Sequence, residues 1–146
     1  MRALLFLVAA LPFRVLTPAR YRALAARAAD TRADSRFLGA VDGDALCENM
    51  VLCFRAGKPF AFDPFLVNEK VVVGRVAETV VEEVIASTRF RVIQTDVDVL
   101  AEPDPTQDRQ GAIERRGRFT RHTLAALRRH YRLDRVSANG AFYIPK

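Results

Sequence analysis

The sequence is poor in the residues that mark fibrous, disordered and low-complexity proteins. Its 146 residues include only seven glycines and seven prolines, and half of the residues are hydrophobic. Disordered and collagen-like classes are therefore excluded. A chain of this length and composition is expected to fold as one domain that buries a substantial core.

Lysine is scarce as well, since only three of the 23 basic residues are lysines and the rest are arginines. Arginine is the better phosphate clamp because its planar guanidinium offers paired donors. The net charge of +6 is unevenly placed: it is +5 over residues 1–40, −6 over 41–106 and +6 over 107–135. A nucleic-acid-binding protein usually gathers its cations on one surface, so basic arms around an acidic middle suit anionic lipid head groups at least as well.

Motifs of the common enzyme classes are missing. No glycine-rich loop joins the first predicted strand to its helix, which excludes a Rossmann or P-loop phosphate cradle. No serine has the context of a nucleophile elbow. His122 and His130 are eight residues apart on one predicted helix, which is not a chelating spacing. The sequence therefore identifies no catalytic residue, no metal site and no cofactor.

Only two cysteines are present, Cys47 and Cys53. They lie on a predicted strand and on the helix that follows it, and such neighbouring positions seldom meet disulfide geometry. We therefore expect buried free thiols, although the sequence does not decide whether the two are oxidised.

The N-terminus lacks an apolar run long enough to cross a bilayer. The run at residues 3–13 has eleven residues, whereas a spanning helix needs about 20. It is typical of a signal h-region or of the end of a membrane helix, and a buried helix of a soluble protein is the alternative. We expect residues 1–16 to associate with a membrane and residues 17–146 to form a soluble domain.

Hydrophobic periodicity, capping residues and turn signals predict alternating helices and strands. The expected elements are a helix from Thr17-Pro18 to about Gly39, a strand at 45–48, a helix capped by Asn49, a strand at 60–62, a helix from Phe65, a helix at 77–88, a strand at 91–99, a loop at 101–118, a helix capped by Thr120 that runs through Tyr131, and a hairpin around Asn139-Gly140. This order predicts a small three-layer α/β domain. Its sheet is mixed and partly parallel, ends in a C-terminal β-hairpin, and follows an N-terminal hydrophobic and helical segment.

Two acidic residues, Asp96 and Asp98, stand at the end of a predicted strand. Carboxylates in this arrangement hold Mg²⁺ or Mn²⁺ against a diphosphate in nucleotide-sugar-dependent glycosyltransferases. A small metal-dependent glycosyltransferase is therefore one hypothesis, although such enzymes need a larger nucleotide-binding domain. Two acids that leave a strand for solvent are the commoner explanation.

A basic cluster later in the chain offers a candidate anion-binding site. It consists of Arg115, Arg116, Arg118 and Arg121. These residues indicate a basic α/β module that binds anionic lipid or nucleic acid, with nucleic acid the less favoured partner. A solvated helix face is the alternative explanation.

Four short motifs carry a resemblance to a known family. The sequence reads ALCEN at 45–49, LCFRAGKPF at 52–60 and FDPF at 62–65, and RFRVI follows at 89–93. This pattern resembles the soluble C-terminal domain of bacterial membrane glycosyltransferases that use polyprenyl-phosphate sugars and are similar to dolichyl-phosphate-mannose mannosyltransferases. The resemblance covers roughly residues 15–146.

The resemblance implies an extracytoplasmic, periplasmic α/β domain that follows a bundle of membrane helices, with residues 1–16 as the end of the last helix. The catalytic acid of that family lies in an early loop between membrane helices, a region absent from this chain. The implied function is that of a detached or truncated accessory domain without sugar-transfer activity alone. Its implied partners are the membrane-embedded catalytic bundle and a polyprenyl-phosphate lipid.

Three residues match the resembling motifs near predicted strand ends, namely Glu48, Lys58 and Asp63. We expect them to contact an acceptor, a lipid phosphate or a neighbouring domain. For Asp63, a turn followed by a helix start is an alternative explanation.

Overall fold

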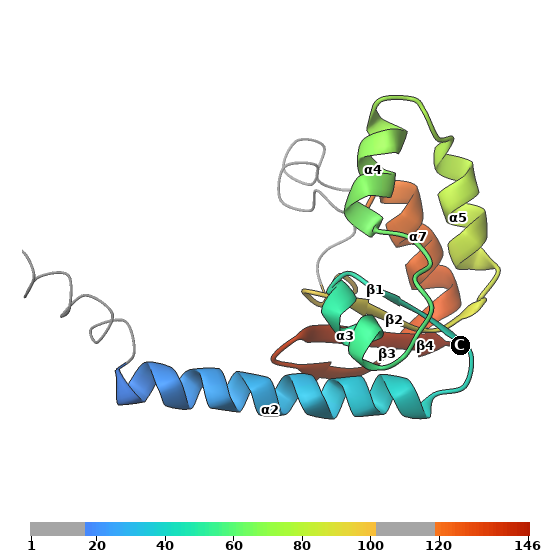
Figure 1. Ribbon diagram of the computed structural model, residues 1–146. Coiled ribbons are helices and arrows are strands. Elements are labelled where there is room, and N and C mark those ends of the chain that lie inside the picture. Colours follow the sequence, from blue (N-terminus) through green and yellow to red (C-terminus); the bar gives the residue numbers. More distant parts are fainter. Residues whose placement is uncertain (1–16, 102–118) are drawn as a thin grey trace, which may run out of the picture.

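A four-stranded mixed sheet forms the centre of the fold (Figure 1). The computed structural model describes residues 17–101 and 119–146. The strands β1 (Asp44–Cys47), β2 (Phe90–Thr95), β3 (Tyr131–Ser137) and β4 (Gly140–Pro145) lie in the order β1-β2-β4-β3. β1 and β2 are parallel, and the other neighbours are antiparallel. The predicted mixed, partly parallel sheet with a C-terminal hairpin is confirmed.

Helices cover both faces of the sheet, which confirms the three layers. They are α2 (Pro18–Ala40), α3 (Met50–Arg55), α4 (Pro64–Val72), α5 (Glu78–Ala86) and α7 (Arg121–His130). In Figure 1, α2 and α3 lie on one side of the sheet, and α4, α5 and α7 lie on the other. Residues 1–16, with the apolar N-terminal run, and residues 102–118, with most of the predicted loop, lie outside the described residues.

Strand side chains alternate between two core clusters because successive residues of a strand point to opposite faces. One cluster joins the sheet to α5 and α7, and includes Leu46, Ile85, Ile93, Leu127 and Tyr143. The other joins the sheet to α2 and α3, and includes Leu38, Cys47, Leu52, Val92 and Phe142. The apolar character of Val92 and Ile93 on both faces identifies β2 as an interior strand, as predicted.

Local capping explains where three of the helices begin. The side chains of Thr17, Asp63 and Thr120 accept hydrogen bonds from backbone N–H groups in the first turns of α2, α4 and α7. Proline follows Thr17 and Asp63 directly, at a position where its missing N–H leaves no helical hydrogen bond unmade.

Two predictions about local structure near β1 are wrong. Residues 60–62 form no strand, because Phe60 is exposed while Phe62 turns inward and packs edge-on against Phe90, with ring centroids 6.0 Å apart. Asn49 does precede α3, but its side chain makes no capping hydrogen bond. Its backbone N–H donates instead to the side chain of Gln94, at 2.9 Å.

Two predicted boundaries also shift. β2 ends at Thr95 rather than near Val99. The last helix ends at His130, and Tyr131 begins β3 with no loop between them. Tyr131 leaves the helix because its side chain is fully buried under the sheet, where its hydroxyl donates to the carbonyl oxygen of Phe90 at 3.1 Å.

Gly140 is required where the hairpin enters β4. Its φ is +106°, and a Cβ there would overlap the carbonyl oxygen of Thr95 and lie 2.8 Å from the carbonyl carbon of Asp96. We expect G140A to lower the free energy of unfolding by about 3 kcal/mol or more, since backbone atoms cannot move aside cheaply. Gly57 is a matched control, because its φ is +70° but no atom lies within 4 Å of the added Cβ. Urea denaturation that gave equal losses for G140A and G57A would contradict the steric argument.

Two fully buried tyrosines should make the fold less stable at high pH. Burial raises the pKa of Tyr131 and of Tyr143 to about 12. Unfolded tyrosines ionise near pH 10, so between about pH 10 and 12 the unfolded state loses protons that the native state retains. The free energy of unfolding should therefore be unaffected by these groups below about pH 10 and fall as pH rises toward 12. The fall should be shallower in Y143F when urea denaturation is repeated across this range, and equal slopes would contradict the prediction.

Candidate functional site

A polar network lies at the carboxyl ends of β1 and β2, the edge where α/β sheets commonly bind ligands. Its centre is Gln94, which is fully buried. The Gln94 amide oxygen accepts from the backbone N–H of Asn49 at 2.9 Å, and its amide nitrogen donates to the carbonyl oxygen of Asn139 at 2.7 Å. This one side chain therefore joins the start of α3 to the hairpin turn.

Glu48 belongs to the same edge. Its backbone N–H donates to the carbonyl oxygen of Gln94 at 3.0 Å, and its carboxylate accepts from the backbone N–H of Asp96 at 2.6 Å. The carboxylate thus secures the chain where β2 ends. The predicted contact of Glu48 with an external ligand stays a prediction.

The network continues to a buried carboxylate that sequence reasoning missed. Asp34 of α2 has a side chain only 1% exposed. It accepts hydrogen bonds from Arg135 at 2.7 Å, Ser137 at 2.6 Å and Asn139 at 2.8 Å. One signal was available, because Asp34 lies four residues before the apolar Leu38 and so shares its helix face.

The guanidinium of Arg135 is held by rings as well as by charge. Its central carbon lies 4.9 Å from the ring centroid of Phe37 and 5.5 Å from that of Phe142. Cation–π attraction and the ion pair with Asp34 therefore act on the same side chain. Together they fasten the C-terminal part of α2 to the β3–β4 hairpin.

Lys58 and Asp63 do not join Glu48 in one site. The Lys58 ammonium donates to the carbonyl oxygens of Val41 and of Gly43, the latter at 3.0 Å. These carbonyls precede β1, whereas Glu48 follows it, so the two charges lie at opposite ends of the strand. Asp63 accepts from the backbone N–H of Phe65 at 2.9 Å, which confirms the helix start.

The Asp98 carboxylate makes hydrogen bonds within the fold. One of its carboxylate oxygens accepts from the backbone N–H groups of Leu100 and Ala101, at 3.0 and 3.1 Å, and from the Tyr143 hydroxyl at 2.9 Å. Across residues 17–101 and 119–146, no three His, Cys, Asp or Glu side chains are arranged to hold a metal ion. The geometry therefore gives no support to a metal site at Asp96 and Asp98.

The predicted anion-binding cluster falls almost wholly outside the described residues. Arg115, Arg116 and Arg118 lie in the range 102–118, and Arg121 is the first residue of α7. Their role in binding anions stays a prediction.

The two cysteines form a disulfide, so the expectation of free thiols is wrong. Cys47 ends β1 and Cys53 lies in α3, with Cα atoms 5.9 Å apart. Only two residues separate the strand from the helix, so α3 turns back and packs Cys53 against Cys47 within one core cluster. This return brings the two Cα atoms within the usual disulfide range.

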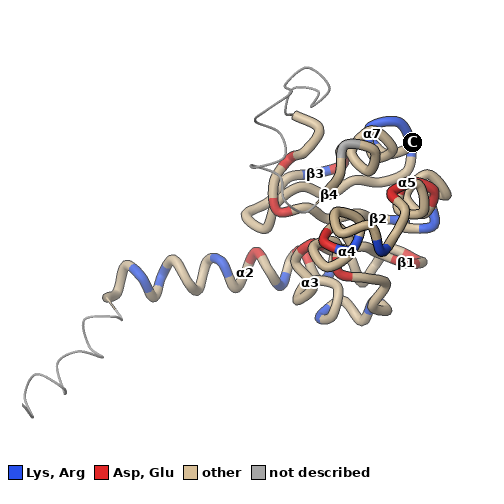
Figure 2. The backbone as a smooth tube through the Cα atoms, turned by 90° about the horizontal axis from the view of Figure 1, so that it is seen from above, with Lys and Arg blue, Asp and Glu red and all other residues tan. Residues whose placement is uncertain are grey.

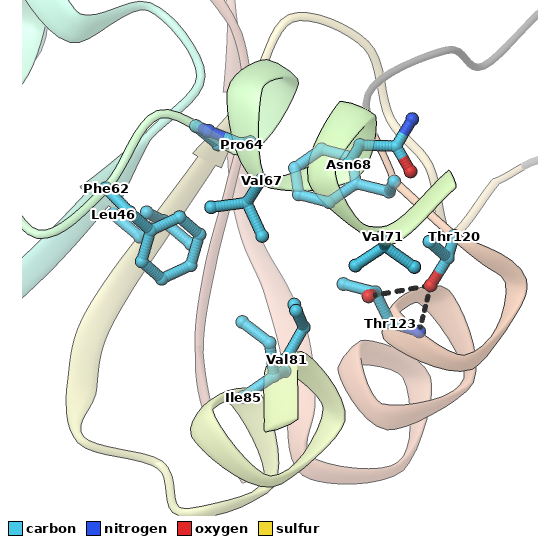
Figure 3. A pocket seen from close by; sticks show the side chains of 11 residues that line it. Leu46, Phe62, Pro64, Val67, Asn68, Val71, Val81, Ile85, Thr120 and Thr123 are labelled. Atoms are coloured by element: carbon cyan, nitrogen blue, oxygen red, sulfur yellow. Dashed lines mark hydrogen bonds between the residues drawn. The ribbon is translucent and has the colours of Figure 1, made fainter. Parts of the chain in front are cut away.

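The cavity drawn in Figure 3 is a small gap between packed side chains rather than a ligand site. It lies between the sheet and helices α4, α5 and α7, where side chains such as Phe62, Val67 and Ile85 converge. Its volume is about 10 Å³. That is about the space one water molecule needs, and the lining is mostly apolar.

None of the described helices combines the length and the apolar character needed to cross a bilayer.

The contacts of Asp34 predict a large effect on stability. D34A leaves Arg135, Ser137 and Asn139 without their shared acceptor, so we expect it to lower the free energy of unfolding by about 3 kcal/mol. Asp30, exposed one turn earlier on α2, is a matched control, and D30A should change stability by less than about 0.5 kcal/mol. The measurement is urea denaturation followed by circular dichroism. Similar losses in the two variants would show that the buried carboxylate does not secure α2.

Comparisons with known proteins add no relative to this picture. No family model, no curated protein and no solved structure matches the chain. Its function is therefore argued from its own residues, from the geometry above and from the resemblance of residues 45–65.

Proposed function

We propose that this chain is an accessory extracytoplasmic domain of a membrane glycosyltransferase-like protein and transfers no sugar by itself. In this proposal, residues 1–16 associate with the membrane and residues 17–146 lie on the periplasmic side. The partner is a membrane-embedded catalytic bundle that acts on polyprenyl-phosphate sugars. The glycosyltransferase part rests on the resemblance alone.

The disulfide is the observation that most directly supports the proposed extracytoplasmic location. Disulfides persist in oxidising compartments such as the periplasm and are rare in the reducing cytosol. The bridge between Cys47 and Cys53 lies within the stretch that carries the resemblance, and both residues are buried. A buried structural bridge at this point supports a domain that folds outside the cytoplasm.

The shape of α2 supports a link to a membrane. Its 23 residues extend about 34 Å. Figures 1 and 2 show its N-terminal part projecting away from the folded domain, with its basic residues spaced along it. Only Asp34, Ser35 and Leu38 of this helix are buried. The exposed part thus acts as a spacer between the domain and the apolar N-terminal sequence.

The positive charge near the N-terminus favours the opposite side of the membrane. Four arginines follow the apolar run within residues 14–27, and positive charge beside a membrane segment favours the cytoplasmic side. The disulfide and the charge distribution therefore make contrary predictions, which a measurement of topology separates.

The test uses the full chain expressed in a bacterial host. We expect it in the membrane fraction. Because Cys47 and Cys53 are buried, cells are quenched in acid and denatured before a maleimide reagent is applied, and we expect both residues to resist the reagent until a reductant is added. The C47A/C53A variant controls for unspecific labelling, and a variant without residues 1–16 should leave the membrane fraction. Free thiols in untreated cells, or a full chain that stays in the soluble fraction, would contradict the proposal.

The glycosyltransferase part has its own test. The genomic sequence immediately upstream, read in the same frame, should encode hydrophobic helices. Their absence from that frame would count against a catalytic bundle as the partner without affecting the test of membrane association.

A further inference from the structure

A groove between α2 and α3 gathers positive charge on the described part of the molecule. Its volume is about 460 Å³, and it is open to solvent. Three of its lining residues are arginines, namely Arg32 and Arg36 of α2 and Arg55 of α3. All three side chains are exposed. None of them pairs with a carboxylate of residues 17–101 or 119–146.

Helical spacing explains why the α2 residues share one wall. Arg32, Ser35, Arg36 and Gly39 stand at positions i, i+3, i+4 and i+7, which lie on one face of a helix. Gly39 lies beside the end of α3, since a Cβ added there would be in ordinary contact with the carbonyl oxygen of Ala56, at 3.4 Å. The two helices therefore meet at Gly39 and hold their arginines around one space.

Ser35 lies between Arg32 and Arg36 in this wall but is not part of its charged surface. It is only 8% exposed, and its hydroxyl oxygen is buried and has no hydrogen-bond partner among the described residues. A hydroxyl that solvent does not reach offers no donor to a ligand in the groove, so the arginines alone define its chemistry.

We propose that this groove binds a phosphate group through the guanidiniums of Arg32, Arg36 and Arg55. Phosphate oxygens suit this set because each arginine can donate two parallel hydrogen bonds to an oxyanion. Arg32 and Arg36 are like charges four residues apart, which repel in the empty groove. A bound dianion relieves that repulsion.

The ligand is a phosphomonoester or diphosphate, carried either by a lipid head group or by a soluble compound. The inference does not depend on the membrane topology proposed above, because it uses only residues of the folded domain. It also concerns residues other than the arginine cluster at 115–121.

The test measures binding of inorganic pyrophosphate by calorimetry and of phosphatidylcholine vesicles containing phosphatidic acid by co-sedimentation, with the full chain at physiological salt. R36Q should weaken binding about tenfold or more, the loss expected for a hydrogen bond between charged groups. R22Q, which removes the same charge from the exposed part of α2, should bind as the wild type does.

The two probes separate the sources of the phosphate. Binding of pyrophosphate that R36Q weakens and R22Q does not would support a soluble ligand, and the same pattern with vesicles alone would support a lipid head group. Neither probe binding, or equal losses in R36Q and R22Q, would overturn the proposal. If the arginines only stabilise the carbonyl ends of α2 and α3, R36Q and R55Q will lower stability and leave binding of both probes unchanged. That result would also overturn the proposal.

Discussion

The buried carboxylate of Asp34 is the contact on which the arrangement of the layers depends. It lies on α2, yet its three hydrogen-bond partners all belong to the β3–β4 hairpin or its turn, about a hundred residues later in the chain. A charge removed from water needs such partners to be tolerated. Asn139, one of the partners of Asp34, also accepts a hydrogen bond from Gln94 through its carbonyl oxygen. Gln94 in turn accepts a hydrogen bond from the backbone N–H of Asn49 at the start of α3. Four distant segments thus share one set of polar contacts.

The covalent bridge complements this network at the carboxyl end of β1. The carboxyl end of the strand is tied to α3 by the disulfide and to β2 by the carboxylate of Glu48. Its amino end is tied to the loop after α3 by Lys58. Two of the motifs behind the resemblance, at 45–49 and 52–60, therefore coincide with residues that build β1, α3 and the loop after it, and their spacing has a structural explanation within this chain.

Local signals predicted most of the fold. Thr17 and Thr120 cap helices as expected, and Asp63 does so as the alternative explanation for it had it. The adjacent apolar residues Val92 and Ile93 identified an interior strand that is covered on both faces. Most of what failed depended on contacts distant in sequence, which periodicity does not encode. The inward turn of Phe62 onto Phe90 and the burial of Asp34 against the hairpin are of this kind. The pairing of Cys47 with Cys53, only six residues apart, was missed for another reason, since it depends on how sharply α3 turns back after β1. The sequence placed Glu48 at the end of a strand, and the structure has it at the carboxyl end of β1. The sequence did not reveal that Lys58 lies at the opposite end of the same strand.

The clamp at Asp34 gives α2 a mechanical property. About 24 Å of helix lies between that residue and Pro18, and a tilt of about 10° at the clamp moves the far end by about 4 Å. Arg135 and the hairpin hold the helix where it meets the sheet. A force applied to its N-terminal end would therefore act first on the polar contacts of Asp34 and on the arginine-lined groove wall that follows them along α2.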